Sequence, residues 1–251
     1  MLKGIFFDLY GTLYKYGNMP KAWDDWLDTL YLNFRIFDKN LTKDSLSNAC
    51  EGFFSKDEPV EDGSGLSLFE RRIKRLAQEL SYNIPDETIK KTATENLNAW
   101  HNYITLDEQT IPLLESLKDR FVLGLVSNFD HPEHVKNLLA ADKIDKYFSS
   151  IVISGEVGFK KPDKRIFDIT LQNTNLLSEE VLFVGDSNDD IQGAKSAGIV
   201  PIHIKRDSES VNMLDYNKIE DKEEHNNNGL LVISHLDQLI KIIDGKNNET
   251  E

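Results

Sequence analysis

Four short polar clusters in this sequence contain residue types that bind cations and anions, and each cluster follows an apolar run. Their residues are Asp8, Tyr10, Gly11 and Thr12; Ser127 and Asn128; Lys160 and Lys161; and Asp186, Ser187, Asp189 and Asp190. Carboxylate oxygens are preferred ligands of Mg²⁺, and a lysine together with a cation can offset the charge of a phosphoryl group. Brought together, the clusters could bind a divalent cation, supply a carboxylate nucleophile and hold an anionic substrate.

Asp8 and Asp186 are the strongest candidates for ligands of a single Mg²⁺ ion, which they would hold at about 2.1 Å. Asp186 directly follows the glycine that ends an apolar run, whereas Asp189 is better interpreted as a surface acid or a helix cap. Ser127 and Asn128 precede a helical stretch. They could cap that helix, bind an anion at its N-terminus, or do both.

The apolar runs are continuous rather than alternating, which is typical of strands buried on both faces of a parallel sheet. They cover residues 3–7, 120–126, 150–154, 180–185, 200–204 and 229–234. Helix-like stretches separate them, and a closing helix is expected over 234–243. The alternation predicts a three-layer, Rossmann-like α/β fold. Because ligands bind beyond the carboxyl ends of the strands in such a sheet, the four clusters should converge at one edge.

Residues 15–105 interrupt this pattern, because they contain amphipathic helical segments and no convincing buried strand. An insertion of about 90 residues is far longer than an ordinary loop. We therefore expect a discontinuous core of residues 1–14 and 106–245, and an all-helical cap domain of residues 15–105. A polar stretch at 207–229 is expected to be a solvated loop, and residues 246–251 a frayed tail.

The composition excludes several classes of partner. With 43 acidic and 29 basic residues, the net charge is −14, which disfavours nucleic acid and acidic membrane surfaces. No run is long enough to span a bilayer, and the start of the sequence does not resemble a signal peptide. The single cysteine, Cys50, suits a reducing compartment. The sequence thus indicates a cytoplasmic protein, while no pattern in it indicates an oligomeric state.

In the motifs that contain the four polar clusters, the sequence resembles the haloacid dehalogenase superfamily of hydrolases. The matching motifs are "FFDLYGTL", "LVSN", "GFKKPDKRIF" and "VGDSNDDIQGAKSAG", in that order. The resemblance covers roughly residues 1–14 and 106–205. The helical insertion matches, in position, the cap of the subgroup that carries a helical bundle after the first motif.

The resemblance implies a role for each matching residue. Asp8 would be the nucleophile that forms a covalent aspartyl intermediate, and Lys161 would steady the charge on Asp8 and on the substrate. Thr12 and Ser127 would hold the substrate anion. The residues implied in substrate binding are Gly11, Ser127 and Asn128, and those implied at the Mg²⁺ site are Asp8, Asp186, Asp190 and the backbone carbonyl of Tyr10.

Tyr10 departs from the phosphatase pattern. Phosphatases of the superfamily usually have Asp at this position, which protonates the leaving oxygen and then activates water. A phenol with a pKa of about 10 is a poor substitute, and losing a positioned acid or base typically costs about 10²–10⁴-fold in rate. Tyrosine here is instead the pattern of the 2-haloacid dehalogenases.

Other residues favour the phosphatase branch. The dehalogenases lack the metal-binding acid that Asp186 provides, and they have a tyrosine where this chain has Phe167. They also need a cap arginine, and none of Arg35, Arg71, Arg72 and Arg75 is singled out by its context. We therefore predict a Mg²⁺-dependent phosphatase for a small phosphorylated metabolite, slow because of Tyr10. The alternatives are a metal-independent dehalogenase and a weakly active or non-catalytic protein that binds phosphorylated ligands.

Overall fold

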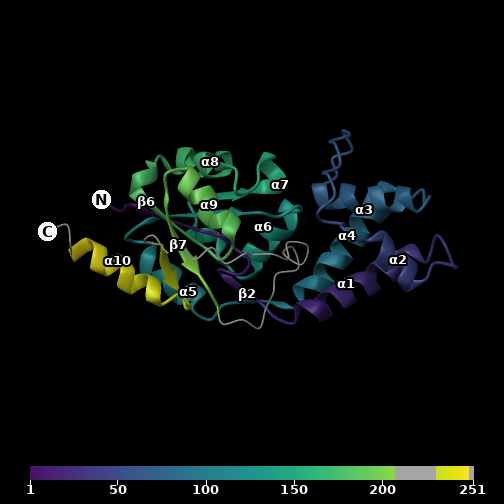
Figure 1. The fold of residues 1–251 in the computed structure, drawn as a ribbon, viewed down its shortest axis with the longest axis horizontal. Helices are drawn as coiled ribbons and strands as arrows, with labels where there is room; N and C mark the ends of the chain where they lie inside the picture. Colours follow the sequence, from purple (N-terminus) through teal and green to yellow (C-terminus); the bar gives the residue numbers. More distant parts are fainter. Residues whose placement is uncertain (207–229, 249–251) are drawn as a thin grey trace.

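The computed structural model describes residues 1–206 and 230–248, and at its centre is a parallel sheet (Figure 1). The strand order is β5-β4-β1-β6-β7-β8, and every neighbouring pair is parallel. The strands are β1 (Gly4–Phe7), β4 (Val122–Ser127), β5 (Ser150–Ile153), β6 (Val181–Gly185), β7 (Val200–Ile204) and β8 (Leu231–Ile233). Each lies within or next to a predicted apolar run, so the predicted sheet is confirmed.

Helices cover both faces of this sheet, as expected for a three-layer fold. They are α5 (Thr110–Leu117), α6 (Pro132–Ala141), α7 (Ser154–Val157), α8 (Lys164–Thr174), α9 (Asn188–Ser196) and α10 (Gln238–Asn248). Alternate residues of β1 pack in two different hydrophobic clusters. Phe6 packs with residues of α8 and α9, whereas Ile5 and Phe7 pack in the cluster that contains residues of α5, α6 and α10. All three side chains are fully buried, which explains the continuous apolar run.

The helical insertion lies to one side of the sheet (Figure 1). It consists of α1 (Met19–Phe34), α2 (Lys43–Ala49), α3 (Leu68–Glu79) and α4 (Asp86–His101). Trp26 of α1 is 1% exposed, and its carbonyl accepts a hydrogen bond from the Asn96 amide of α4 at 2.8 Å. Side chains of Thr42 and Ser67 cap α2 and α3. Within the described ranges, no helix is both long and apolar enough to cross a membrane.

Three details differ from the sequence prediction or lie outside the described residues. A short antiparallel pair, β2 (Tyr14–Tyr16) and β3 (Ile104–Leu106), joins the insertion to the rest of the chain. Strands of three residues are too short to show a hydrophobic period, so they were not expected. The helix α10 extends to Asn248, into the segment expected to be frayed. The predicted loop at 207–229 and residues 249–251 lie outside the described residues.

Candidate active site

The parallel strands bring three of the four clusters to one edge of the sheet. β1 pairs with β4 on one side and with β6 on the other, with Phe7 in register with Leu125 and Val184. Asp8 therefore emerges beside Ser127 and Asp186, and its backbone N–H donates to the Val184 carbonyl at 2.8 Å. One carboxylate oxygen each of Asp8, Asp186 and Asp190 lies within 4.8 Å of the others.

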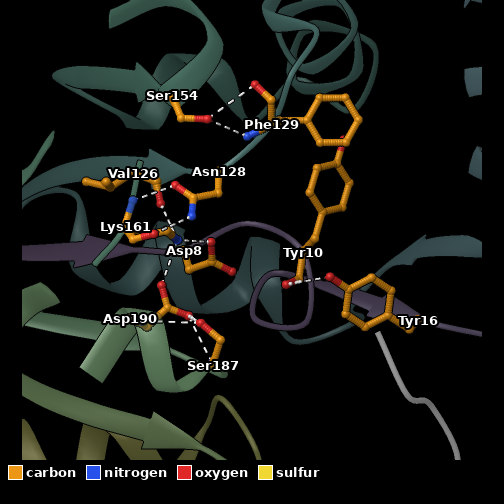
Figure 2. Close-up of polar contacts among 10 residues, drawn as sticks. All are labelled: Asp8, Tyr10, Tyr16, Val126, Asn128, Phe129, Ser154, Lys161, Ser187 and Asp190. Atoms are coloured by element: carbon orange, nitrogen blue, oxygen red, sulfur yellow. Dashed lines mark hydrogen bonds and ion pairs between the residues drawn. The ribbon is translucent and has the colours of Figure 1, made fainter. Parts of the chain in front are cut away.

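Lys161 connects the fourth cluster to Asp8 and Asp190 (Figure 2). Its Nζ lies 2.5 Å from Oδ1 of Asp8 and 2.6 Å from Oδ1 of Asp190, and it donates to the Val126 carbonyl at 3.0 Å. The Lys161 side chain is 3% exposed. A buried cation with this many acceptors is held in a single position.

Asp190 also takes part in capping the N-terminus of α9. Its Oδ2 accepts hydrogen bonds from the Ser187 hydroxyl at 2.7 Å and from the Ser187 N–H at 3.0 Å. The Ser187 hydroxyl in turn accepts from the Asp190 N–H, which makes a capping box. Both Asp190 oxygens are thus engaged by the protein, so this residue orients Lys161 and the helix.

Burial and mutual repulsion control protonation at this edge. Burial, together with the nearby Asp190 charge, raises the pKa of Asp8 to about 6, although Lys161 opposes the shift. Burial and the charges of Asp8 and Asp190 also raise the pKa of Asp186. Burial would lower the pKa of Lys161, but Asp190 and Asp8 outweigh it and raise that pKa.

Gly11 allows the loop after β1 to approach Asp186. Its φ is +92°, and a Cβ added there would lie 2.1 Å from Oδ2 of Asp186. Any larger residue would therefore be strained and would displace a carboxylate of the site. Arg206 holds the same loop, because its guanidinium donates to the carbonyls of Gly11, at 3.1 Å, and Thr12. No motif in the sequence singles out Arg206.

The residues predicted to bind the substrate anion have different surroundings. The hydroxyls of Thr12 and Ser127 are buried and have no hydrogen-bond partner among the described residues. The Asn128 amide is occupied by the Lys161 backbone, since it donates to the carbonyl at 3.0 Å and accepts from the N–H at 2.8 Å. Neither Ser127 nor Asn128 caps α6, whose N-cap is His131.

Tyr10 is part of an aromatic cluster that also contains Trp100 and Phe129. Its ring centroid lies 5.1 Å from that of Phe129 and 5.2 Å from that of Trp100. Figure 2 shows the ring directed toward Phe129 rather than toward the Asp8 carboxylate. Its hydroxyl is buried without a hydrogen-bond partner among the described residues, and burial, followed by the Asp8 charge, raises its pKa. The Tyr10 carbonyl accepts from the Tyr16 hydroxyl at 3.1 Å.

A pocket of about 880 Å³ opens beside Asp8, Lys161 and Asp186, and we call it the Asp8 pocket. The helical insertion supplies part of its wall. Arg72 of α3 belongs to that wall although it is 3% exposed. Its Nε donates to Asp130 at 2.8 Å, and its Nη1 donates to the carbonyls of Phe53 and Lys56. Only the tertiary structure distinguishes Arg72 from the other arginines of the insertion.

The donor set of this edge fits a hard divalent cation. Three carboxylates face one ammonium, which leaves two negative charges uncompensated among the described groups. The Oδ2 of Asp8 is buried without a hydrogen-bond partner among the described residues, and burying such an oxygen is costly unless something binds it. Carboxylate oxygens without sulfur or imidazole ligands suit Mg²⁺. Asp8 and Asp186 are the residues that would hold it.

A comparison of the sequence with known protein families agrees with this arrangement of acids and lysine. The family model of haloacid dehalogenase-like hydrolases matches residues 2–198. The chain belongs to this family. It is therefore a hydrolase, and the family predicted from the four motifs is confirmed. Phe167, which indicated the phosphatase branch, is fully buried and packs against Phe183 at 5.0 Å, so it stabilises the core rather than lining the pocket.

Relatives and solved structures extend the likeness to the whole chain. Glyceraldehyde 3-phosphate phosphatase of Pyrococcus furiosus is 24% identical over 259 residues, which cover 98% of this chain and 95% of that protein. Phosphoserine phosphatase of Thermus thermophilus is 30% identical over 139 residues, or 55% of each chain. A HAD phosphatase structure from Thermococcus onnurineus has a TM-score of 0.65 at 21% identity and covers 96% of this chain and 98% of its own. That structure shares the fold.

Proposed function

We propose that this hydrolase is a Mg²⁺-dependent phosphatase that acts on a small phosphorylated metabolite through an aspartyl-phosphate intermediate. A carboxylate oxygen of Asp8 would attack phosphorus while Lys161 offsets the negative charge of both groups. Water would then release phosphate and restore the Asp8 carboxylate. A bound Mg²⁺ would stabilise the charge that develops on the phosphoryl oxygens. The naming of both curated relatives as phosphatases supports this reaction class.

The observation that carries the proposal is the charge balance at the end of the sheet. Asp8, Asp186 and Asp190 lie together with Lys161 as their only close cation among the described residues. A divalent cation and a phosphoryl group complete such a site electrostatically. A halide-displacing site would have no use for the acid at residue 186.

We also propose that residues 15–105 act as a cap over the site. Both Leu97 and Trp100 of α4 line the Asp8 pocket together with Asp8 itself. A cap in this position would exclude water during the first step and would decide which leaving groups fit.

A phosphate panel with and without Mg²⁺ tests the proposal. Hydrolysis is expected only with Mg²⁺, and Asp8→Asn should lower it by at least about 10³-fold, because an amide cannot act as the nucleophile. Asp24→Asn, at an exposed position of α1, is the matched control and should leave the rate unchanged.

Mg²⁺ at about 100 times its Kd should also stabilise the wild type against unfolding by about 2.7 kcal/mol, and Asp186→Asn should remove this effect. Metal-independent hydrolysis would contradict the proposal.

Tyr10 favours a second candidate, a metal-independent 2-haloacid dehalogenase. Its measurement is chloride release from a 2-haloacid in the presence of EDTA. We expect none, because Asp186 lies within the carboxylate cluster and no described arginine of the insertion is unpaired at the pocket wall. A protein that is inert on every phosphate ester but is stabilised by phosphorylated ligands would instead be a binding relative.

A further inference from the structure

The leaving-group end of the Asp8 pocket is aromatic, and the described residues of its wall include no unpaired cation. From this we infer that the substrates are phosphate monoesters of aromatic hydroxyl compounds, in which the bridging oxygen is attached directly to a flat ring. The inference rests on the phosphatase function proposed above and names the class of substrate for that same site.

The aromatic wall comes from both parts of the chain. The helical insertion contributes the rings of Trp26, Phe54, Phe69 and Trp100, all of which line the pocket. The core contributes Tyr10 and Phe129, which contact each other and Trp100 with ring centroids 5.1 to 5.8 Å apart. A phosphoryl group alone would leave most of about 880 Å³ unfilled. Rings of this kind gain stability from offset or edge contact with another flat ring.

The cations of the pocket are already neutralised by carboxylates of the chain. In the described part of the wall they are Lys56 with Glu79 at 3.0 Å, Arg72 with Asp130 at 2.8 Å, Lys160 with Glu58 at 2.9 Å, and Lys161 with Asp8 at 2.5 Å. A leaving group that carries its own carboxylate, such as serine, would find no unpaired positive charge there. Removing it from water would therefore be unfavourable.

The residue two positions after Asp8 adds an independent argument. Tyr10 points into the aromatic cluster, and no carboxylic acid stands in its place to protonate a departing oxygen. In the first step, the bond from Asp8 to phosphorus forms and the bond from phosphorus to the bridging oxygen breaks. The electron pair stays on the leaving oxygen. A ring delocalises that charge, so an aryloxide departs without a proton, whereas an alkoxide does not.

The second step, hydrolysis of the aspartyl phosphate, needs water as its only other reactant. Water attacks phosphorus of the aspartyl phosphate, the bond between phosphorus and the Asp8 oxygen breaks, and dihydrogen phosphate leaves. The Asp8 carboxylate is restored. The aryloxide released in the first step then takes up a proton from solvent or from phosphate.

Four probes separate ring recognition from leaving-group chemistry. Phenyl phosphate has a ring and an aryloxide, benzyl phosphate a ring and an alkoxide, ethyl phosphate neither, and acetyl phosphate a good leaving group without a ring. With Mg²⁺, we expect kcat/KM for phenyl phosphate to exceed that for benzyl phosphate by at least about 10²-fold, because kcat/KM reports the step in which the leaving group departs even where hydrolysis of the shared aspartyl phosphate limits kcat. The KM for benzyl phosphate should be about tenfold lower than that for ethyl phosphate, because only the former places a ring against the aromatic wall.

Two variants test the wall itself. Trp100→Leu should raise the KM for phenyl and benzyl phosphate by about tenfold and leave acetyl phosphate unaffected. Trp23→Leu is its matched control, since Trp23 stacks on Trp26 in the insertion but does not line the pocket. Tyr10→Asp should narrow the difference in kcat/KM between phenyl and benzyl phosphate, because an acid at residue 10 could protonate the alkoxide.

The outcomes distinguish a failure of the aryl-substrate inference from a failure of the proposed phosphatase function. If ethyl and benzyl phosphate are hydrolysed as well as phenyl phosphate, the phosphatase assignment holds and the aryl inference is wrong. If kcat/KM is higher for phenyl than for benzyl phosphate but benzyl and ethyl phosphate have equal KM values, ring recognition is wrong, and the inference fails with it. If even acetyl phosphate is not hydrolysed, the proposed function itself fails.

Discussion

At the scale of the residue, the position of Lys161 depends on Asn128 as much as on the acids. The Asn128 amide pairs with both the N–H and the carbonyl of Lys161. These bonds join the end of β4 to the loop before α8, which the chain separates by 33 residues. The ammonium can then reach Asp8 and Asp190 with little freedom to move. Asn128 therefore acts on the chemistry through Lys161.

Asn128→Ala should lower kcat by about 10-fold to 100-fold, because a small displacement of a catalytic group has a large effect on rate. It should also lower the free energy of unfolding by about 1–3 kcal/mol, since two backbone groups lose their partner. Steady-state kinetics and urea unfolding measure both. Asn137→Ala, at an exposed position of α6, is the control and should change stability by less than about 0.5 kcal/mol. An unchanged kcat in Asn128→Ala would show that Lys161 is positioned by other contacts.

At the scale of the element, α6 packs its first turn against α4 through histidines. The His134 ring stacks on Phe129 at 5.7 Å and meets the His101 ring edge-on at 5.5 Å. Its Nε2 is buried without a partner in the described structure. Burial, together with His101 and His131, lowers the pKa of His134 to about 4. The packing of these two helices therefore requires a neutral imidazole.

This packing predicts acid sensitivity. An unfolded histidine binds a proton below a pH of about 6.5, whereas folded His134 does so only near 4. Between these values the unfolded state binds more protons, so stability is lost as the pH falls. From pH 7.5 to pH 5 the loss from His134 is about 2 kcal/mol.

Urea unfolding at pH 7.5 and pH 5 measures this loss. His134→Gln should reduce the difference between the two pH values, while His235→Gln, at an exposed position, should not. Equal pH differences in wild type and His134→Gln would mean that another group controls the acid response.

At the scale of the whole molecule, several ion pairs among the described residues connect the helical insertion to the core, and two of them differ in burial. Arg72 pairs with Asp130 at 2.8 Å with side-chain exposures of 3% and 26%, whereas Lys160 pairs with Glu58 at 2.9 Å with exposures of 63% and 46%. The backbone N–H of Phe69 also donates to the Asp130 carbonyl at 3.1 Å. Because water screens the exposed pair, the buried pair should contribute most to holding the two parts together.

Neutralising each acid separately compares the two bridges. Asp130→Asn should lower the free energy of unfolding by about 1–3 kcal/mol, because it leaves the buried Arg72 without its counter-charge. Glu58→Gln removes the same charge from the exposed bridge and should change stability by less than about 0.5 kcal/mol. Thermal unfolding of both variants at equal salt measures the difference. Equal effects would show that burial does not distinguish the two bridges.

The hydrophobic pattern was sufficient to predict the sheet and the part of the site that the sheet positions. Asp8 and Asp186 directly follow buried runs, and parallel strands end at the same edge, so their meeting follows from the hydrophobic pattern. The tertiary structure alone decided the roles of Arg72 and Arg206 and the direction of the Tyr10 ring. These depend on which distant segments touch: Arg72 meets Asp130, and Tyr10 meets Trp100 and Phe129. The hydrophobic periodicity of a segment indicates only whether a side chain is buried. Which distant residues that side chain contacts depends on how whole helices and strands pack together.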